Sequence, residues 1–281
     1  MTARISAITA FRLTTAQPER LAPFYEGLGF KVGEPEAIGE DEIALLGVGC
    51  RGVRLPLRLG AQRLDLDSFE IPGQPYPRDT TAADLCFQHL ALVTDDAAAA
   101  WRHVSRLGAL AISIGGPVKL PPATGVAAAM KFRDPEGHPL ELLQFPPQSA
   151  GRWRGTGVLG IDHSAISVSA ADTSRHFYEA LGLSVHGRTL NEGRAQVALD
   201  ALPDVEVDVV PMLPAATTPH LELLGYRRPT GRSAGQLAAN DIAGTRTVWA
   251  ADRDQLLRDP DGHLHLLRRE PPARQGRSGG R

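Results

Sequence analysis

Cysteine is scarce in this sequence. Cys50 and Cys86 are the two cysteines among 281 residues, and they do not form a CxxC motif. Two isolated cysteines exclude the dense disulfide framework that stabilises small secreted domains. Such usage is typical of a reducing compartment, so we predict two free thiols and a cytoplasmic location.

The sequence also lacks charged blocks and long apolar runs. Its formal net charge is −2, with no basic block before the extreme C-terminus, so we expect neither nucleic acid nor a membrane surface as a partner. No apolar run approaches the roughly 18 residues that span a bilayer, and residues 1–15 lack the features of a signal peptide. Residues 271–281 are rich in proline, glycine and arginine, which predicts a disordered tail.

What the chain does contain is a repeat. Residues 24–30 (FYEGLGF) recur as residues 177–183 (FYEALGL), and residues 133–138 (RDPEGH) recur as residues 258–263 (RDPDGH). The second pair stands closer together than the first, so the second half is shorter. We predict two homologous halves, residues 1–148 and 158–270, joined by a linker at 149–157.

Each half divides again by its pattern of apolar residues into βαβββ units. The first half gives units at residues 1–70 and 82–146, and the second half gives two more, the last of which looks degenerate. The expected strands and helices are strands at 5–14, 42–48, 52–59, 63–69 and 87–94, helices at 18–27 and 95–107, and strands near Ala109, Ala127 and Leu140. In the second half we expect a strand at 160–168, a helix at 171–180, strands near Ser184, Ala195 and Val205, and a strand at 220–226 that opens the fourth unit.

A carboxylate interrupts one of the most apolar strands. After the tight turn at residues 134–137, the strand around Glu141 is otherwise apolar except for Gln144. A buried carboxylate is costly unless a positive group meets it. A metal ion or an arginine would serve, and the sequence pattern leaves both partners open.

The repeated motifs resemble those of a known family. Four βαβββ units, FYExLGF after the first helix and DPxGxxxEL at the last strand resemble the vicinal oxygen chelate superfamily, which includes glyoxalase I, extradiol dioxygenases and bleomycin resistance proteins. Residues 163–183 match the first-strand motif well. The resemblance implies an α+β fold in which paired units form cupped mixed sheets. It also implies a divalent metal ion, with ligands from the first and last strand of each unit.

The resemblance places candidate ligands by position. The first unit offers Ala10, which cannot bind a metal, and Asp65; the second offers an intact pair, His89 and Glu141. The candidates in the two remaining units are His163 with Glu206 or Asp208 in the third, and His220 with the apolar Leu266 in the fourth.

Two ways of pairing the units remain open. If the units pair in sequence, Asp65, His89 and Glu141 form one site, and His163 and His220, with Asp208 as a further candidate, form a second. If the middle units pair, His89, Glu141 and His163 meet as a two-histidine, one-carboxylate set suited to Fe(II) or another divalent ion. The plainer alternatives are a hydrogen-bonded core histidine at position 89 and a carboxylate at position 141 that pairs with an arginine.

The resemblance leaves three functions open. The first is a glyoxalase-like lyase or isomerase, in which a divalent ion (Fe, Mn, Zn, Ni or Co) chelates adjacent oxygens of a small substrate and Glu141 moves a proton. The second is an extradiol dioxygenase with Fe(II) or Mn(II). Ring-cleaving members carry a tyrosine where this chain has Lys131 and Leu256, so that function ranks lower, although Tyr76 or Tyr226 could substitute. The third is a non-catalytic binding or resistance protein. A monomer or a homodimer is compatible with all three.

Overall fold

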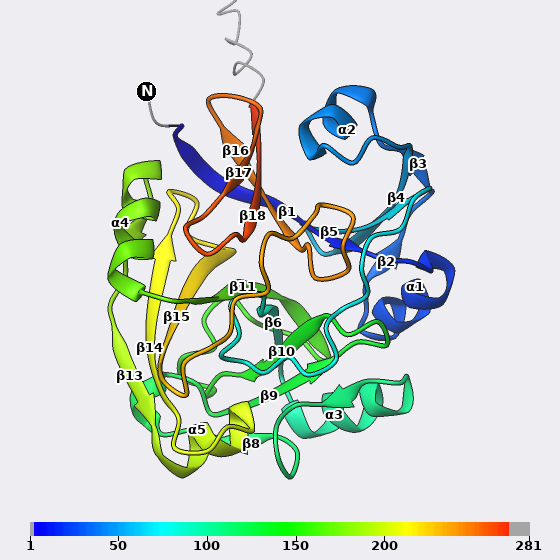
Figure 1. Ribbon diagram of the computed structural model, residues 1–281. Coiled ribbons are helices and arrows are strands. Elements are labelled where there is room, and N and C mark those ends of the chain that lie inside the picture. The colour runs from blue at the N-terminus through cyan, green and yellow to red at the C-terminus, as the bar shows by residue number, and fades with distance from the viewer. Residues whose placement is uncertain (1–2, 270–281) are drawn as a thin grey trace, which may run out of the picture.

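The computed structural model describes residues 3–269, which fold into two mixed sheets with five α-helices around them (Figure 1). The predicted tail, residues 271–281, lies outside the described residues. Within the described part of the chain, no helix is both long and apolar enough to cross a membrane.

The first sheet has eight strands and joins the two ends of the chain. Its order is β17-β18-β16-β1-β5-β4-β2, and β3 also pairs with β4. The strands are β1 (Ile5–Thr14), β2 (Lys31–Val32), β3 (Glu36–Ala37), β4 (Gly52–Leu59), β5 (Gln62–Phe69), β16 (Arg246–Ala251), β17 (Gln255–Arg258) and β18 (Leu264–Arg269).

The second sheet has ten strands and is built from the middle of the chain. Its order is β12-β14-β15-β11-β6-β10-β9-β7, with β13 on β14 and β8 on β9. The strands are β6 (Gln88–Thr94), β7 (Leu110–Ala111), β8 (Val118–Lys119), β9 (Ala128–Arg133), β10 (Pro139–Gln144), β11 (Val158–Val168), β12 (Ser184–Val185), β13 (Thr189–Glu192), β14 (Glu206–Leu213) and β15 (His220–Arg228).

The middle units pair with each other, and the first unit pairs with the fourth, as in the second of the two predicted arrangements. β1 pairs antiparallel with β16, which joins the first unit to the fourth, and β6 pairs antiparallel with β11, which joins the second to the third. Helices α1 (Pro18–Gly27), α3 (Ala97–Arg106) and α4 (Ala171–Leu181) pack against the sheets. The main apolar core includes residues from both sheets and these helices, such as Leu64, Leu140 and Tyr178.

Two segments predicted as strands are helices. Residues 40–46 form α2 (Glu40–Leu46), which ends at Gly47 in the left-handed conformation (φ 68°). Three acidic residues in the first turn of α2 favour its helical N-terminus electrostatically, and a left-handed glycine is a common helix stop. The predicted strand near Ala195 is likewise a helix, α5 (Gly193–Asp200).

The segment from His220 also takes a different place from the one predicted. β15 pairs parallel with β11 and antiparallel with β14, so it closes the third unit instead of opening the fourth. The fourth unit begins at β16. Within the described residues, no helix follows β16, which accounts for the degenerate pattern of this unit. The correction to β15 moves a glutamate, Glu222, into the position that Glu141 holds in the second unit.

Candidate functional site

Two histidines lie on neighbouring central strands of the ten-stranded sheet. His89 on β6 is opposite Ala165, and His163 on β11 is opposite Ala91. The two imidazole rings have centroids 5.8 Å apart, and both residues are buried. The register therefore brings the first strands of the second and third units together at their histidines.

A glutamate flanks each histidine from the outer strands. On β10, Glu141 is beside Ala91, and on β15, Glu222 is beside Ala165. The two histidines and the two glutamates line one cavity. Four strands thus present two imidazoles and two carboxylates to the same space.

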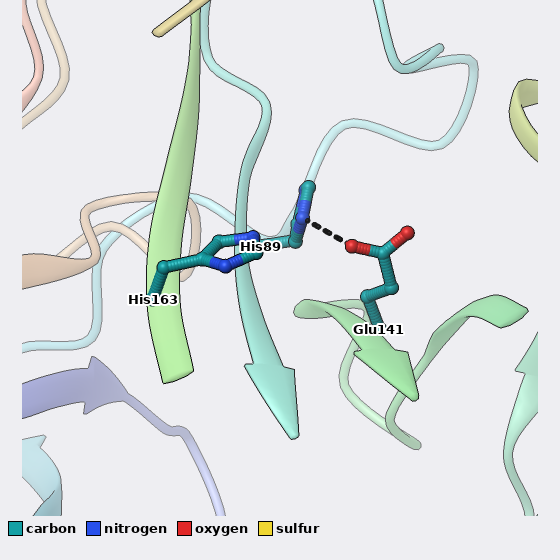
Figure 2. A group of neighbouring side chains, drawn as sticks. All are labelled: His89, Glu141 and His163. Carbon is teal, nitrogen blue, oxygen red and sulfur yellow. Dashed lines mark hydrogen bonds and ion pairs between the residues drawn. The ribbon is translucent and has the colours of Figure 1, made fainter. Parts of the chain in front are cut away.

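The side chains approach within hydrogen-bonding or ion-pairing distance. His89 Nε2 lies 3.0 Å from Glu141 Oε2, and His163 Nε2 lies 3.4 Å from Glu222 Oε2. Figure 2 shows the ring of His163 directed toward His89, which in turn faces Glu141. Ligand atoms of His89, Glu141 and His163 lie within 4.8 Å of one another, close enough to share one metal ion.

Two buried nitrogen atoms in this cluster lack hydrogen-bond partners within the described residues. They are His89 Nδ1 and His163 Nε2. Buried polar atoms are nearly always paired in native structures, so unpaired ones need an explanation. A metal ion is an acceptable partner for an imidazole nitrogen, and two imidazoles with one carboxylate, as in His89, His163 and Glu141, are a donor set that divalent transition metals favour. The residues present therefore fit such an ion.

The charges of the cluster follow from burial and proximity. Burial lowers the pKa of His89, and the opposing effect of Glu141 does not reverse it. Burial also acts to lower the pKa of His163, but Glu222, Asp162 and Glu141 outweigh it and raise that pKa to about 9. The pKa of Glu222 is lowered to about 2 because His163 and His220 outweigh the effect of burial. Glu222 is therefore ionised at neutral pH, as metal binding requires, whereas His163 is protonated in the metal-free cluster and would release a proton when an ion binds.

A β-bulge gives His163 a second partner. The pairing of β11 with β6 shifts between Ile161 and His163, and both Asp162 and His163 line the cavity. Consecutive residues in a regular strand face opposite sides, so this arrangement depends on the bulge. Asp162 Oδ2 lies 3.1 Å from His163 Nδ1. An Nδ1–H donated to Asp162 leaves His163 Nε2 as the atom available to a metal.

His220 stands next to this group on β15. Its Nε2 lies 3.5 Å from Glu222 Oε1, and its Nδ1 lies 4.0 Å from Asp162 Oδ2. Asp162, His163 and His220 form a second set of atoms close enough to hold an ion. The two sets share His163.

The cavity around the cluster has a volume of about 250 Å³. Its walls combine apolar residues with polar ones such as Arg188 and Asn191, and α5 contributes to them through Gln196 and Leu199. The other apolar lining residues include Leu143, Phe145, Val207, Val209 and Leu224. A space of this size with a few convergent polar groups is suited to a small molecule.

The remaining predicted ligand, Asp65, lies in the other sheet. Its Oδ1 accepts a hydrogen bond from Arg63 Nε at 2.6 Å, and its Oδ2 lies 3.4 Å from Arg12 Nε and 3.6 Å from Arg54 Nε. The structure does not bring Asp65 near His89. Within residues 3–269, the eight-stranded sheet carries no group of histidine, cysteine or acidic residues close enough to share an ion.

The cup of the eight-stranded sheet, meaning its concave face, is instead filled by side chains of the sheet and of α2. Ala10 and Leu266 pack with Val248 and with Leu45 of α2. Glu42, also on α2, forms ion pairs with Arg12 and Arg54.

Glu222 and Asp162 were not among the ligands predicted from the sequence. The signal for Glu222 was present, because residues 221–224 (LELL) repeat residues 140–143 (LELL). Asp162 depends on a bulge that no sequence pattern revealed. Asp208, an alternative ligand of the third unit, forms ion pairs with Arg227 at 2.7 Å and Arg188 at 3.1 Å.

Comparison with known proteins agrees with this architecture. The family model described as Glyoxalase/Bleomycin resistance protein/Dioxygenase superfamily matches residues 5–142. Glyoxalase I from Zea mays has a TM-score of 0.59 and 16% identity, with 95% of this chain and 92% of that chain covered. A point mutant of the same maize enzyme has a TM-score of 0.62 and 18% identity over the same shares. At these identities the likeness concerns the fold. No curated protein matches the sequence.

Proposed function

The chain carries a domain of the Glyoxalase/Bleomycin resistance protein/Dioxygenase superfamily, and we propose that it is a metal-dependent lyase or isomerase of glyoxalase type. The observation that carries this proposal is the set of His89, Glu141, His163 and Glu222, which converge from four strands on one cavity. The substrate class is a small molecule with two adjacent oxygens.

The four side chains would hold the ion, and the chain prepares them for it. His89 Nδ1 and His163 Nε2 have no hydrogen-bond partner among residues 3–269. A bound divalent ion would supply a Lewis acid that polarises a substrate carbonyl. His89, Glu141 and His163 are buried, and the lower dielectric constant around buried groups strengthens electrostatic interactions.

Glu141 is the group that we assign to proton transfer. Its Oε2 faces His89, and its Oε1 accepts no hydrogen bond from the described residues. Burial raises the pKa of Glu141, but His89, Lys131 and His163 lower it further than burial raises it. The ionised carboxylate would take a proton from the carbon next to the substrate carbonyl and return it to the neighbouring carbon.

A ring-cleaving dioxygenase is the second candidate, and one observation favours it. His89, Glu141 and His163 form a two-histidine, one-carboxylate group, which suits Fe(II). Tyr226 also lines the cavity, although its hydroxyl donates to Asp200 at 2.9 Å. Lys131 stands where the ring-cleaving members of the family carry a tyrosine, so this function ranks below the first.

Metal analysis combined with two reaction assays tests the proposal. The variants are His89→Ala, Glu141→Ala, His163→Ala and Glu222→Ala, with Glu206→Ala as the matched control, because Glu206 is on the same sheet but outside the cavity. We expect near-stoichiometric metal in the wild type and the control, and loss of metal in the four variants.

The reaction class is read from proton exchange. We expect the loaded wild type to exchange the proton next to the carbonyl of 2-hydroxyketones with deuterium from the solvent, as followed by NMR. Oxygen consumption with catechols, without exchange, would favour the dioxygenase. A protein that binds no metal after reconstitution would overturn both and leave a non-catalytic binding protein.

A further inference from the structure

A buried lysine reaches the same cavity as Glu141. Lys131 on β9 lies directly opposite Glu141 on β10, and directly opposite residues of an antiparallel pair face the same side of a sheet. The side chain of Lys131 is 4% exposed and lines the cavity. A buried ammonium group is costly without compensation, so its partners are informative.

The compensating carboxylate lies behind the lysine, away from the cavity. Lys131 Nζ donates to Asp200 Oδ1 at 2.6 Å, and Asp200 Oδ2 accepts from Gln196 Nε2 at 2.7 Å and from the Tyr226 hydroxyl at 2.9 Å. Lys131, Gln196 and Tyr226 line the cavity, whereas Asp200 does not. A molecule in the cavity therefore meets the ammonium side of the ion pair.

The ammonium group retains hydrogen-bonding capacity. Lys131 Nζ carries three N–H donors, and within residues 3–269 Asp200 is the acceptor that it uses. The carboxylate of Glu141, on the neighbouring strand, lies beyond ion-pairing distance of Nζ. Two donors are thus available to a ligand oxygen in the cavity.

The Lys131–Asp200 ion pair is one of several contacts that hold α5. The end of α5 is fixed by two other hydrogen bonds, from Ser113 Oγ to the Leu199 carbonyl and from the Ile114 amide to the Ala198 carbonyl, both at 2.8 Å. Buried ion pairs are also poor stabilisers, because an apolar pair of similar volume is often at least as stable. Stability alone does not account for Lys131 in the cavity wall.

We propose that Lys131 binds an anionic group of the substrate, a carboxylate or a phosphate. This inference rests on the proposed function, in which two adjacent oxygens of the substrate face the histidine and glutamate cluster. The inference adds a third contact, between an anionic group of the substrate and Lys131 on the β9 side of the cavity. A charged ligand oxygen is expected because a hydrogen bond between two ionised groups is about twice as strong as one between neutral groups. The cavity volume of about 250 Å³ limits the ligand to a small acid.

Three probes that differ at one end test the proposal. Each is a 2-hydroxy acid, which offers adjacent oxygens to an ion: 2-hydroxybutyrate ends in a methyl group, malate in a carboxylate and 3-phosphoglycerate in a phosphate. Titration calorimetry on cobalt-loaded protein measures affinity, and the visible absorption of cobalt reports whether the probe reaches the ion. We expect malate or 3-phosphoglycerate to bind about tenfold or more tightly than 2-hydroxybutyrate.

Two variants separate ligand binding from a structural role. Lys131→Met removes the ammonium group, and Asp200→Asn keeps it while removing the carboxylate behind it. We expect Lys131→Met to abolish the preference for the anionic probes and Asp200→Asn to retain it. The same loss of preference in both variants, or no preference in the wild type, would overturn the proposal. If Lys131→Met fails to fold, the double variant Lys131→Met/Asp200→Asn, which removes both charges of the pair, is measured in its place, and we expect it to lack the preference for the anionic probes.

Failure of this inference is distinguishable from failure of the proposed function. If all three probes perturb the cobalt spectrum but bind equally, the metal site stands and the anion site is overturned. If the protein takes up no cobalt, the proposed function fails, and calorimetry with malate on the metal-free protein decides the anion site. Binding that Lys131→Met abolishes and Asp200→Asn preserves would then support it, and no binding would overturn it.

Discussion

Glu141 and Glu222 occupy equivalent positions on the two strands that flank the central pair, β6 and β11, of the ten-stranded sheet. Glu141 is beside Ala91 of β6, and Glu222 is beside Ala165 of β11. Each of these alanines is in turn opposite the histidine of the other central strand. The site is therefore nearly twofold symmetric, with one histidine and one glutamate from each of two homologous units.

This symmetry predicts equal roles for the two glutamates in holding a metal ion. Glu222→Gln and Glu141→Gln should each lower metal affinity by about tenfold or more, because each replaces a charged ligand by a neutral amide. Affinity is measured by competition with a chromophoric chelator. His220→Gln is the control, since His220 contacts Glu222 but belongs to the other group of candidate ligands. A loss of metal in His220→Gln, with Glu222→Gln unchanged, would assign the ion to that other group.

Asp162 should act on the metal through His163. Removal of a carboxylate that orients a metal-bound histidine typically costs about 10- to 100-fold in affinity. We expect Asp162→Ala to show a loss of that order with full stoichiometry, and Asp162→Asn to recover most of it, because the amide oxygen still accepts from Nδ1–H. The measurement is metal affinity together with the absorption spectrum of the cobalt form. An altered spectrum in Asp162→Asn would instead indicate that Asp162 is itself a ligand.

The sequence predicted the architecture well because its signals are strong and repeated. Residues 18–27 were expected to be helical and form α1 with those bounds. Repetition of the turn motif and of the FYE motif identified two homologous halves, the apolar pattern divided them into four units, and the resemblance placed His89, Glu141 and His163 at matching positions.

The errors fall where local pattern is ambiguous. Residues 42–48 contain a short apolar run that suits a strand as well as a helix, and tertiary contacts decide the outcome. Glu42 on α2 pairs with Arg12 and Arg54 across the cup of the eight-stranded sheet, and neither arginine is near it in sequence. The assignment of β15 depended on which strand it pairs with, which sequence spacing alone does not determine.

The turn motif of the first half predicts a pH-dependent contribution to stability. His138 Nδ1 lies 2.7 Å from Asp134 Oδ2, and its Nε2 lies 2.9 Å from the Thr14 carbonyl. Burial acts to lower the pKa of His138, but Asp134 outweighs it, and the pKa is raised. The stabilisation is therefore complete below the unfolded-state pKa of about 6.5 and is lost as pH rises through the raised folded-state pKa.

Denaturant unfolding of the wild type and His138→Gln at pH 5.5 and pH 9 checks this expectation. At pH 5.5 the unfolding free energy of the wild type should exceed that of His138→Gln by about 1.5–3 kcal/mol. This difference should be smaller at pH 9. Tyr25→Phe is the control, because the Tyr25 hydroxyl donates to the same carboxylate oxygen at 2.9 Å and does not titrate in the physiological range. A difference between wild type and His138→Gln that is equal at both pH values would contradict the prediction.

The ion cluster in the eight-stranded sheet should contribute to folding and not to metal binding. Arg246 is fully buried, and its Nη2 lies 3.0 Å from Asp67 Oδ2, while Arg54 Nε lies 2.7 Å from Asp67 Oδ1. Asp67→Asn leaves two arginines short of their counter-charge, so it should lower the unfolding free energy by about 3–5 kcal/mol. The double variant Asp67→Leu/Arg246→Met removes the charges together and should recover part of that loss. Metal content should stay at the wild-type value in both folded variants, because the His89 cluster lies in the other sheet; loss of metal from a folded variant would show that the two cups are coupled.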